Sequence, residues 1–372
     1  MKIYKTRSQL FFVLVMATLL VACGGGGGGS AASSSAATGV TVVPALGAFS
    51  TGVRVEAYDP VTGLAIGDGA TTDATGKAVI DLGTHATSFV LKVSGSATAK
   101  YFEEGLTTSG TDIAFTSNDV MLALVPASAA VTKGASIGVT PLTHMAAGFA
   151  VNSLSDLKVN IPAGKDAADV MYEAMARVRY ITGMPVQTSE RGKITLNPLL
   201  APSVLSATTK ASGINLSQSG GYYGLYLAEL SKAVSTENTP RSSLDLAKSL
   251  FNRAAALKAL ISAGTLATTS QSVTDFLASS DLLALNAAAA AVGSGNSIFL
   301  NTCKTLPNAD ALTYNAIFTG ANQNNTAASA FVPSANDLAQ MVLDLTFAAD
   351  AKITKNLVSP FTETSTGANG CS

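Results

Sequence analysis

Ser136 lies in a segment whose residue pattern matches that of a hydrolase nucleophile. Residues 134–138 (GASIG) follow the G-x-S-x-G spacing, which in hydrolases needs a buried parallel strand before it and a helix directly after it. Such a serine also needs a base, and His144 is the only histidine beyond position 85. Here the pattern lies between a β-rich region and a helix expected from Pro141, which would commit His144 to the surface of that helix. We therefore predict no catalytic residue, and a serine hydrolase using Ser136 with His144 is the alternative.

Paired carboxylates could perform general acid–base chemistry if they faced each other across a cleft. The adjacent residues Glu103 and Glu104, together with Asp156, are the candidates. Nothing in their spacing places them around a cleft, so we expect solvated surface charges.

A second group of acidic residues is a candidate calcium site. Asp59, Asp68 and Asp73 occupy turn-like positions, and hard cations bind clustered carboxylates. The spacing is not that of an EF-hand, and aspartate in a turn commonly accepts hydrogen bonds from its own backbone. We predict the turn role. With two histidines and no CxxC pair in the sequence, we expect neither a metal site nor a cofactor.

The first 22 residues have the layout of a secretory signal. A basic stretch precedes an apolar run over residues 10–22, which ends in Leu-Val-Ala immediately before Cys23. This run is shorter than the roughly 20 residues that a helix needs to cross a bilayer. The alternatives are an ordinary cleaved signal followed by a chance cysteine, and a retained membrane span.

The same segment resembles a bacterial lipoprotein signal with its lipobox. The resemblance implies that Cys23 receives a diacylglyceryl group, that cleavage occurs before it, and that the new amino terminus is acylated, for example with palmitate. Because Gly24 rather than aspartate follows the cysteine, the resemblance points to the outer membrane. Multiple acyl chains would make release from the membrane very slow.

The composition predicts a flexible tether and argues against nucleic acid as a partner. Residues 24–38 are nearly all Gly, Ser and Ala, which predicts a flexible coil with a root-mean-square reach on the order of 20 Å. Removal of the signal takes away three of the 23 basic residues, which leaves 20 against 24 acidic residues and a net charge of −4. This balance gives no electrostatic footprint for nucleic acid.

Two cysteines remain if Cys23 carries lipid. Cys303 and Cys371 form an even pair in an oxidising compartment, so we predict a disulfide between them. Such a bond would be worth about 4 kcal/mol on the chain-entropy model. The alternative is two thiols too far apart to bridge.

The pattern of residues 39–127 predicts antiparallel β-structure. Val53, Val55 and Ala57 alternate with polar residues, and turn-forming residues follow at 59–63. Short strands separated by Gly and Asp turns favour a sandwich. The expected strands are 53–58, 77–82, 88–93, 99–103 and 113–125.

A family resemblance appears in this region. The runs VRVEAYDPVTG, TTDATGKAVIDL and SFVLKVSG resemble the carboxypeptidase regulatory-like (prealbumin-like) sandwich, in which a strand ends in Asp-x-x-Thr-Gly and a Thr-Asp-x-x-Gly turn leads into an alternating strand. The match covers residues 39–127, a quarter of the 372-residue chain. It implies a sandwich that serves as an accessory or binding module. An immunoglobulin-like sandwich of different topology is the alternative.

The second part of the chain reads as helical, which makes the fold class α+β. We expect a linker at 128–139 and a mainly helical domain over 140–372. Thr140 can cap a helix that begins at Pro141. Further helices are expected at 166–182, 222–234, from 239–240 to Gly264, as one or two helices over 271–292, and at 336–349.

These observations together predict a non-enzymatic, lipid-anchored lipoprotein of the bacterial outer membrane. A β-sandwich on a flexible tether would carry a helical domain that contacts a protein or glycan of the cell envelope. A carbohydrate-binding module on the sandwich is a further alternative. It would require an exposed aromatic row, for which Tyr58, Tyr101 and Phe102 are the candidates.

Overall fold

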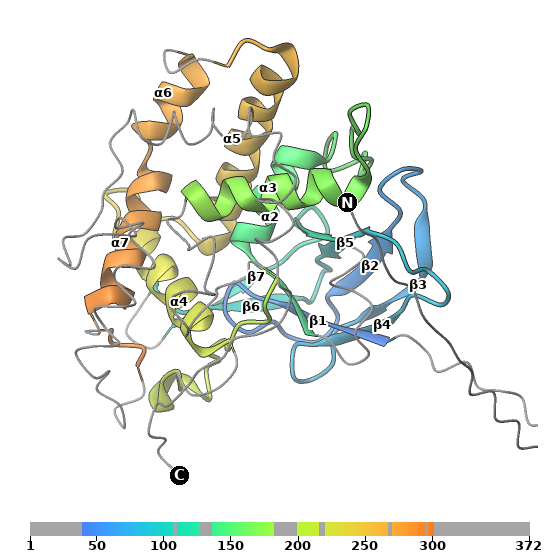
Figure 1. Ribbon diagram of the computed structural model, residues 1–372. Helices are drawn as coiled ribbons and strands as arrows, with labels where there is room; N and C mark the ends of the chain where they lie inside the picture. The colour runs from blue at the N-terminus through green and yellow to red at the C-terminus, as the bar shows by residue number, and fades with distance from the viewer. Residues whose placement is uncertain are drawn as a thin grey trace, which may run out of the picture. The chain divides into compact units, whose positions relative to one another are not determined.

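The chain folds as a set of strands followed by a set of helices, a mixed α+β arrangement (Figure 1). The computed structural model describes residues 39–106, 110–126, 136–181, 199–215, 220–266, 270–294 and 297–300. All of these belong to one compact unit, Ala37–Ser372. The predicted helix at 336–349 lies outside the described residues.

The described strands form three sheets. One sheet has the order β3-β2-β5-β8, a second has the order β4-β1-β9, and β6 pairs with β7 alone. Every pairing is antiparallel except that of β1 with β9. The strands are β1 (Gly39–Pro44), β2 (Arg54–Tyr58), β3 (Ala65–Thr71), β4 (Ala78–Asp81), β5 (Phe89–Ser94), β6 (Lys100–Glu103), β7 (Thr111–Ala114), β8 (Val120–Val125) and β9 (Ser136–Val139).

The runs of alternating apolar and polar residues form strands, as their period of two predicts. In β2, Val55 and Ala57 are buried while the residues between them are partly exposed, as period-two patterning requires. β4, β5 and β6 also match their expected ranges closely. The expected run at 113–125 is two strands, because a turn intervenes in which Asp119 Oδ2 accepts a 2.7 Å hydrogen bond from the Thr116 N–H.

The prediction of a linker over 128–139 is wrong at its end. Residues 136–139 form β9, which pairs in parallel with β1 from Thr41 to Pro44. Ile137 and Val139 are fully buried, so β-branched side chains provide the strand character that the flanking glycines obscured. Residues 127–135 lie outside the described part of the chain.

The described helices follow the strands. They are α2 (Pro141–Ala150), α3 (Ala167–Ile181), the short 3₁₀ turn η1 (Lys210–Ser212), α4 (Gly221–Ser235), α5 (Ser243–Ala263), α6 (Gln271–Leu277) and α7 (Ser280–Ser294). The predicted region at 271–292 is thus two helices. α5 begins at Ser243 rather than near position 240, because the capping box is made by Ser242 and Asp245. Gly264 ends α5 in a left-handed conformation, as predicted.

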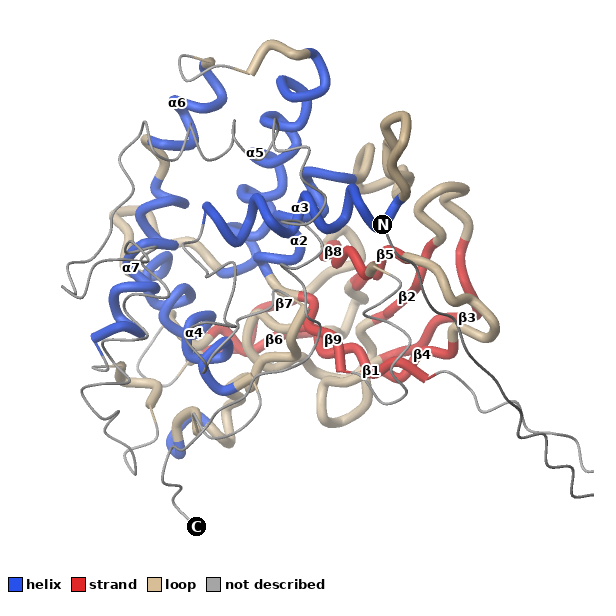
Figure 2. The backbone as a smooth tube through the Cα atoms, in the orientation of Figure 1, coloured by secondary structure: helices blue, strands red, loops and turns tan. Residues whose placement is uncertain are grey.

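Helix α2 joins the helical region to the strands. All ten of its residues are buried, and it contacts β8, α3 and α5 (Figure 2). Thr140 caps it by accepting a hydrogen bond from the Thr143 N–H, and the Thr140 hydroxyl also bonds the Tyr223 hydroxyl of α4 at 2.7 Å. A continuous cluster of buried apolar side chains extends from the strands through α2 into the later helices. Among the described helices, none has both the length and the apolar character to cross a bilayer.

Gly148 allows α2 and α5 to approach closely. A Cβ atom at this position would lie 2.5 Å from the Phe251 carbonyl oxygen and 2.8 Å from the Ala254 Cβ. Neither atom belongs to a flexible side-chain end, so the helices would have to separate.

We expect Gly148→Ala to lower the free energy of unfolding by about 1–3 kcal/mol, the usual cost of overpacking a core. Urea denaturation followed by circular dichroism measures this. Gly39→Ala is the control, because its added Cβ meets only the Cγ1 of Val79, whose side chain is 64% exposed and can move. Equal stability of the Gly148→Ala variant and the wild type would contradict this account of the α2–α5 contact.

Candidate functional site

The structure does not join Ser136 and His144 into a catalytic pair. Ser136 begins β9 and is half-buried, whereas His144 is fully buried in α2. The expectation that His144 lies on the helix surface is therefore wrong. Its ring stacks on Phe251 with 4.7 Å between centroids, Nδ1 accepts a hydrogen bond, and buried Nε2 has no partner among the described residues. The Ser136 hydroxyl is thus not bonded to either ring nitrogen.

His144 instead completes the hydrogen bonding of a sheet edge. Among the described strands, β8 is the outermost of its four-stranded sheet, so the N–H groups on its outer edge have no strand partner there. The Leu122 N–H donates to His144 Nδ1 at 3.1 Å, which satisfies a buried donor that would otherwise be costly. This bond makes Nδ1 the acceptor, and the neutral ring then carries its proton on Nε2. Burial, with the nearby charge of Lys248 as a second cause, lowers the pKa of His144 to about 3.

Two of the three aspartates considered for calcium serve their own turns, whereas Asp68 lies within the strand β3. Asp59 Oδ1 accepts hydrogen bonds from the N–H groups of Val61 and Thr62 at 2.9 and 2.8 Å. Asp73 Oδ1 accepts in the same way from Thr75 at 2.7 Å. The turn role is confirmed for both residues. In the part of the chain that the structure describes, no cluster of three or more His, Cys, Asp or Glu side chains could hold a metal ion.

The prediction that Glu103 and Glu104 are solvated surface charges is wrong. They are 0% and 1% exposed, respectively. Asp156 belongs to a loop, where its side chain accepts a 2.9 Å hydrogen bond from Asn152. The two buried glutamates and the following, partly exposed residue, Gly105, form a segment at the end of β6 that we call the 103–105 clasp.

Glu103 holds two helices. Its Oε1 accepts from the hydroxyls of Ser231 in α4 and Ser243 in α5, the latter at 2.6 Å. Its Oε2 accepts from the Ser243 N–H at 2.7 Å. Ser243 is the first residue of α5, so the carboxylate lies at a helix N-terminus, where free N–H groups and the helix dipole favour negative charge. Burial nevertheless raises the pKa of Glu103.

Glu104 extends the clasp to one more segment, residues 205–210, and Gly105 adds a second contact with α4. Glu104 Oε1 accepts from the Leu205 N–H at 2.8 Å, and the Glu104 carbonyl accepts from Lys210 Nζ at 2.7 Å. Gly105 donates to Ser231 Oγ at 2.7 Å, and a Cβ there would lie 2.4 Å from the α4 backbone, so only glycine fits without displacement. Burial raises the pKa of Glu104 to about 8, and neighbouring Glu103 adds to the shift.

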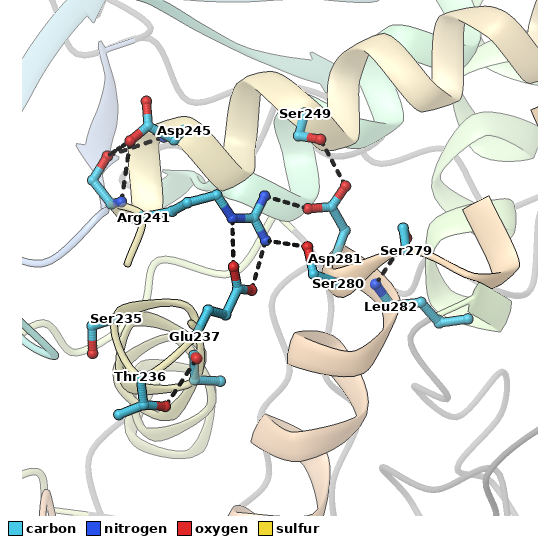
Figure 3. A network of polar contacts seen from close by, with 12 residues as sticks. Ser235, Thr236, Glu237, Arg241, Asp245, Ser249, Ser279, Ser280, Asp281 and Leu282 are labelled. Atoms are coloured by element: carbon cyan, nitrogen blue, oxygen red, sulfur yellow. Dashed lines mark hydrogen bonds and ion pairs between the residues drawn. The ribbon is translucent and has the colours of Figure 1, made fainter. Parts of the chain in front are cut away.

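A second polar network joins α5 and the connection before it to the start of α7 (Figure 3). Arg241 bonds Glu237 and the buried Asp281, at 2.7 and 2.6 Å. Asp281 also accepts from Ser249 and Arg253. Burial would raise the pKa of Asp281, but these donors hold it below its ordinary value. This network pairs a buried charge and so has a structural role.

The strand pattern gives no sequence signal for the buried glutamate. Tyr101 and Glu103 share one face of β6 and Phe102 lies on the other, yet all three are buried, so the alternation does not separate a core face from a solvent face. Helix α2 gives no signal for His144 either, because all of its residues are buried.

The aromatic candidates for a carbohydrate site do not form an exposed row. Tyr101 and Phe102 are buried, and only Tyr58 is partly exposed. The lipidation candidate Cys23 and the disulfide candidates Cys303 and Cys371 lie outside the described residues.

Comparison with protein-family models, with curated proteins and with solved structures finds no match for this chain.

We expect His144→Ala to lower the free energy of unfolding at pH 7 by about 2–5 kcal/mol, because it leaves a cavity and an unpaired Leu122 N–H. The wild type should also lose stability as the pH falls from 6.5 toward 3. The folded-state pKa of His144 is depressed, so its contribution is complete only above the unfolded value. Urea titrations across this pH range measure both effects.

His85→Ala is the matched control, since that ring is half-buried and, among the described residues, its hydrogen bonds are to the nearby Thr87 and Ser88. An equal loss of stability in the two variants would show that His144 does not complete the sheet edge.

Proposed function

We propose that this chain is a non-enzymatic lipoprotein of the bacterial outer membrane, anchored through lipid on Cys23, with a binding or structural role in the cell envelope. The observation that carries the proposal is the position of Cys23, directly after a basic and then apolar leader that ends in Leu-Val-Ala. Three acyl chains on this residue would provide stable anchoring.

The proposed tether leads directly into the first strand. β1 begins at Gly39, immediately after the Gly, Ser and Ala tract of residues 24–38. A flexible segment of that length allows the folded part to stand a short distance from the lipid surface.

We further propose that the N-terminal strands form a prealbumin-like sandwich. Support comes from the buried faces of the two larger sheets, which contribute to the same apolar cluster through Val42 and Ile80 on one side and Val55 and Leu91 on the other. The Asp-x-x-Thr-Gly turn also behaves as a specific structural unit. The Gly63 N–H donates to the Asp59 carbonyl at 2.8 Å.

A non-enzymatic role is favoured by what the candidate catalytic histidine does. His144 is held in the core by Leu122 and Phe251, and its low pKa makes it a poor base near neutral pH. A disulfide between Cys303 and Cys371 remains part of the proposal for the later region of the chain.

We expect Cys23→Ser to abolish incorporation of labelled palmitate and to leave the unprocessed precursor, because the thiol that accepts the diacylglyceryl group is gone. Metabolic labelling in a diderm bacterium followed by membrane fractionation measures this. Cys303→Ser is the control and should label as the wild type does. Palmitate incorporation and outer-membrane fractionation of the Cys23→Ser protein would overturn the proposal.

A further inference from the structure

The 103–105 clasp brings together four segments that are far apart in the sequence. Glu103 contacts Ser231 of α4 and Ser243 of α5, which are 128 and 140 residues away. Glu104 contacts Leu205 and Lys210, which are 101 and 106 residues away in the sequence. The hydrogen bonding of this one segment therefore couples β6 to two helices and to the stretch that contains η1.

The clasp places two adjacent carboxyl groups in the protein interior with little opposing charge. Among the described residues, neither Glu103 nor Glu104 forms an ion pair with a side chain. The charge of Lys210 of η1 acts to lower the pKa of Glu104, but its effect is smaller than that of burial. Its ammonium bonds the main-chain carbonyl of Glu104 and lies near the rings of Phe102 and Phe299, 5.9 and 5.8 Å from their centroids. Two neighbouring carboxylates in such a setting do not both ionise readily.

The other charged groups of the surrounding elements have partners of their own or face away. On β6 the buried Tyr101 hydroxyl is neutral near pH 7, since burial and Glu103 raise its pKa. On β7, Asp112 is exposed opposite Phe102. Lys232 of α4 lies 3.9 Å from Glu229, and Asp245 of α5 accepts a hydrogen bond from Ser242. Leu205 belongs to residues 199–206, which contain no charged residue.

The hydrogen bonds indicate which of the two glutamates carries the negative charge. Glu103 accepts from three donors, which suits an ionised carboxylate. On the Glu104 carboxyl group, the Leu205 N–H is the donor that the structure shows. Glu103 is thus the group equipped to carry negative charge, and Glu104 is the group that keeps its proton.

We propose that Glu104 is a pH-sensitive latch, protonated when the clasp is closed, whose ionisation at alkaline pH loosens the contact of the 205–210 segment and helices α4 and α5 with β6. Ionisation would place a negative charge on a side chain that is buried in the protein interior, and the charge of Glu103 would oppose it. The proposal concerns the fold alone and does not depend on the anchoring of the chain.

The direction of the pH effect on stability follows from the raised pKa of Glu104. The pKa of Glu104 is about 8 in the folded chain, above its ordinary value of 4.5. Its contribution to stability is therefore complete below the unfolded pKa and is lost as the pH rises through the folded one. His144 acts in the opposite direction and at lower pH, so the two effects separate above pH 6.5.

The test compares Glu104→Gln with the wild type in urea titrations of the full chain between pH 6.5 and 9. The amide keeps the shape of a protonated carboxyl group but cannot ionise. The folding equilibrium constant of the wild type should fall at least about tenfold over this range, and that of Glu104→Gln should change by less than about threefold. Asp112→Asn is the matched control on the same hairpin and should keep the wild-type dependence. Equal pH dependence of Glu104→Gln and the wild type would overturn the proposal.

If Glu104→Gln does not fold, a second measurement on the wild type tests the proposal instead. Amide hydrogen exchange on the wild type gives the protection factor of the Leu205 N–H, corrected for the intrinsic effect of pH. The latch predicts a fall of at least about tenfold between pH 6.5 and 9, larger than that of the β5 amides. A constant protection factor would contradict it.

Discussion

The carboxylate of Glu103 lies at the N-terminus of α5, and the attachment of the helices to β6 depends on that contact. A helix begins with N–H groups that have no partner within the helix. Here one of them, the Ser243 N–H, is satisfied by a side chain from a strand 140 residues earlier. The same carboxylate accepts the Ser231 hydroxyl, so one acidic group positions the ends of two helices. Loss of this group would leave several buried donors unpaired, which costs more than the bonds themselves contribute.

A second contact of the same kind holds α2 against the four-stranded sheet. The outer edge of β8 needs an acceptor for the Leu122 N–H, and His144 provides one from within α2. Polar groups of the helical region thus complete hydrogen bonding that the strands cannot complete alone. Since apolar side chains from both regions also share one cluster, we regard the described strands and helices as one cooperative unit.

Local patterns were enough to predict most elements. Alternation identified β2, Thr140 and Pro141 identified the start of α2, and Gly264 identified the end of α5. The strand β9 was missed because its pairing partner, β1, lies almost one hundred positions earlier, and a parallel pairing leaves no local turn signal. The burial of Glu103 and Glu104 was missed for a similar reason. Their donors lie more than 100 residues away, and a charged pair read alone is expected to be exposed.

The central claim is that the strands and helices unfold together, and native-state amide hydrogen exchange tests it most directly. Exchange would be followed at pH 6 with increasing denaturant for amides of β5 (Phe89–Ser94) and of α5 (Ser243–Ala263). The account predicts that the slowest amides of both elements open with the same free energy and the same denaturant dependence. If α5 opens at a lower free energy while β5 stays protected, the helices are a separate unit, and the account is contradicted.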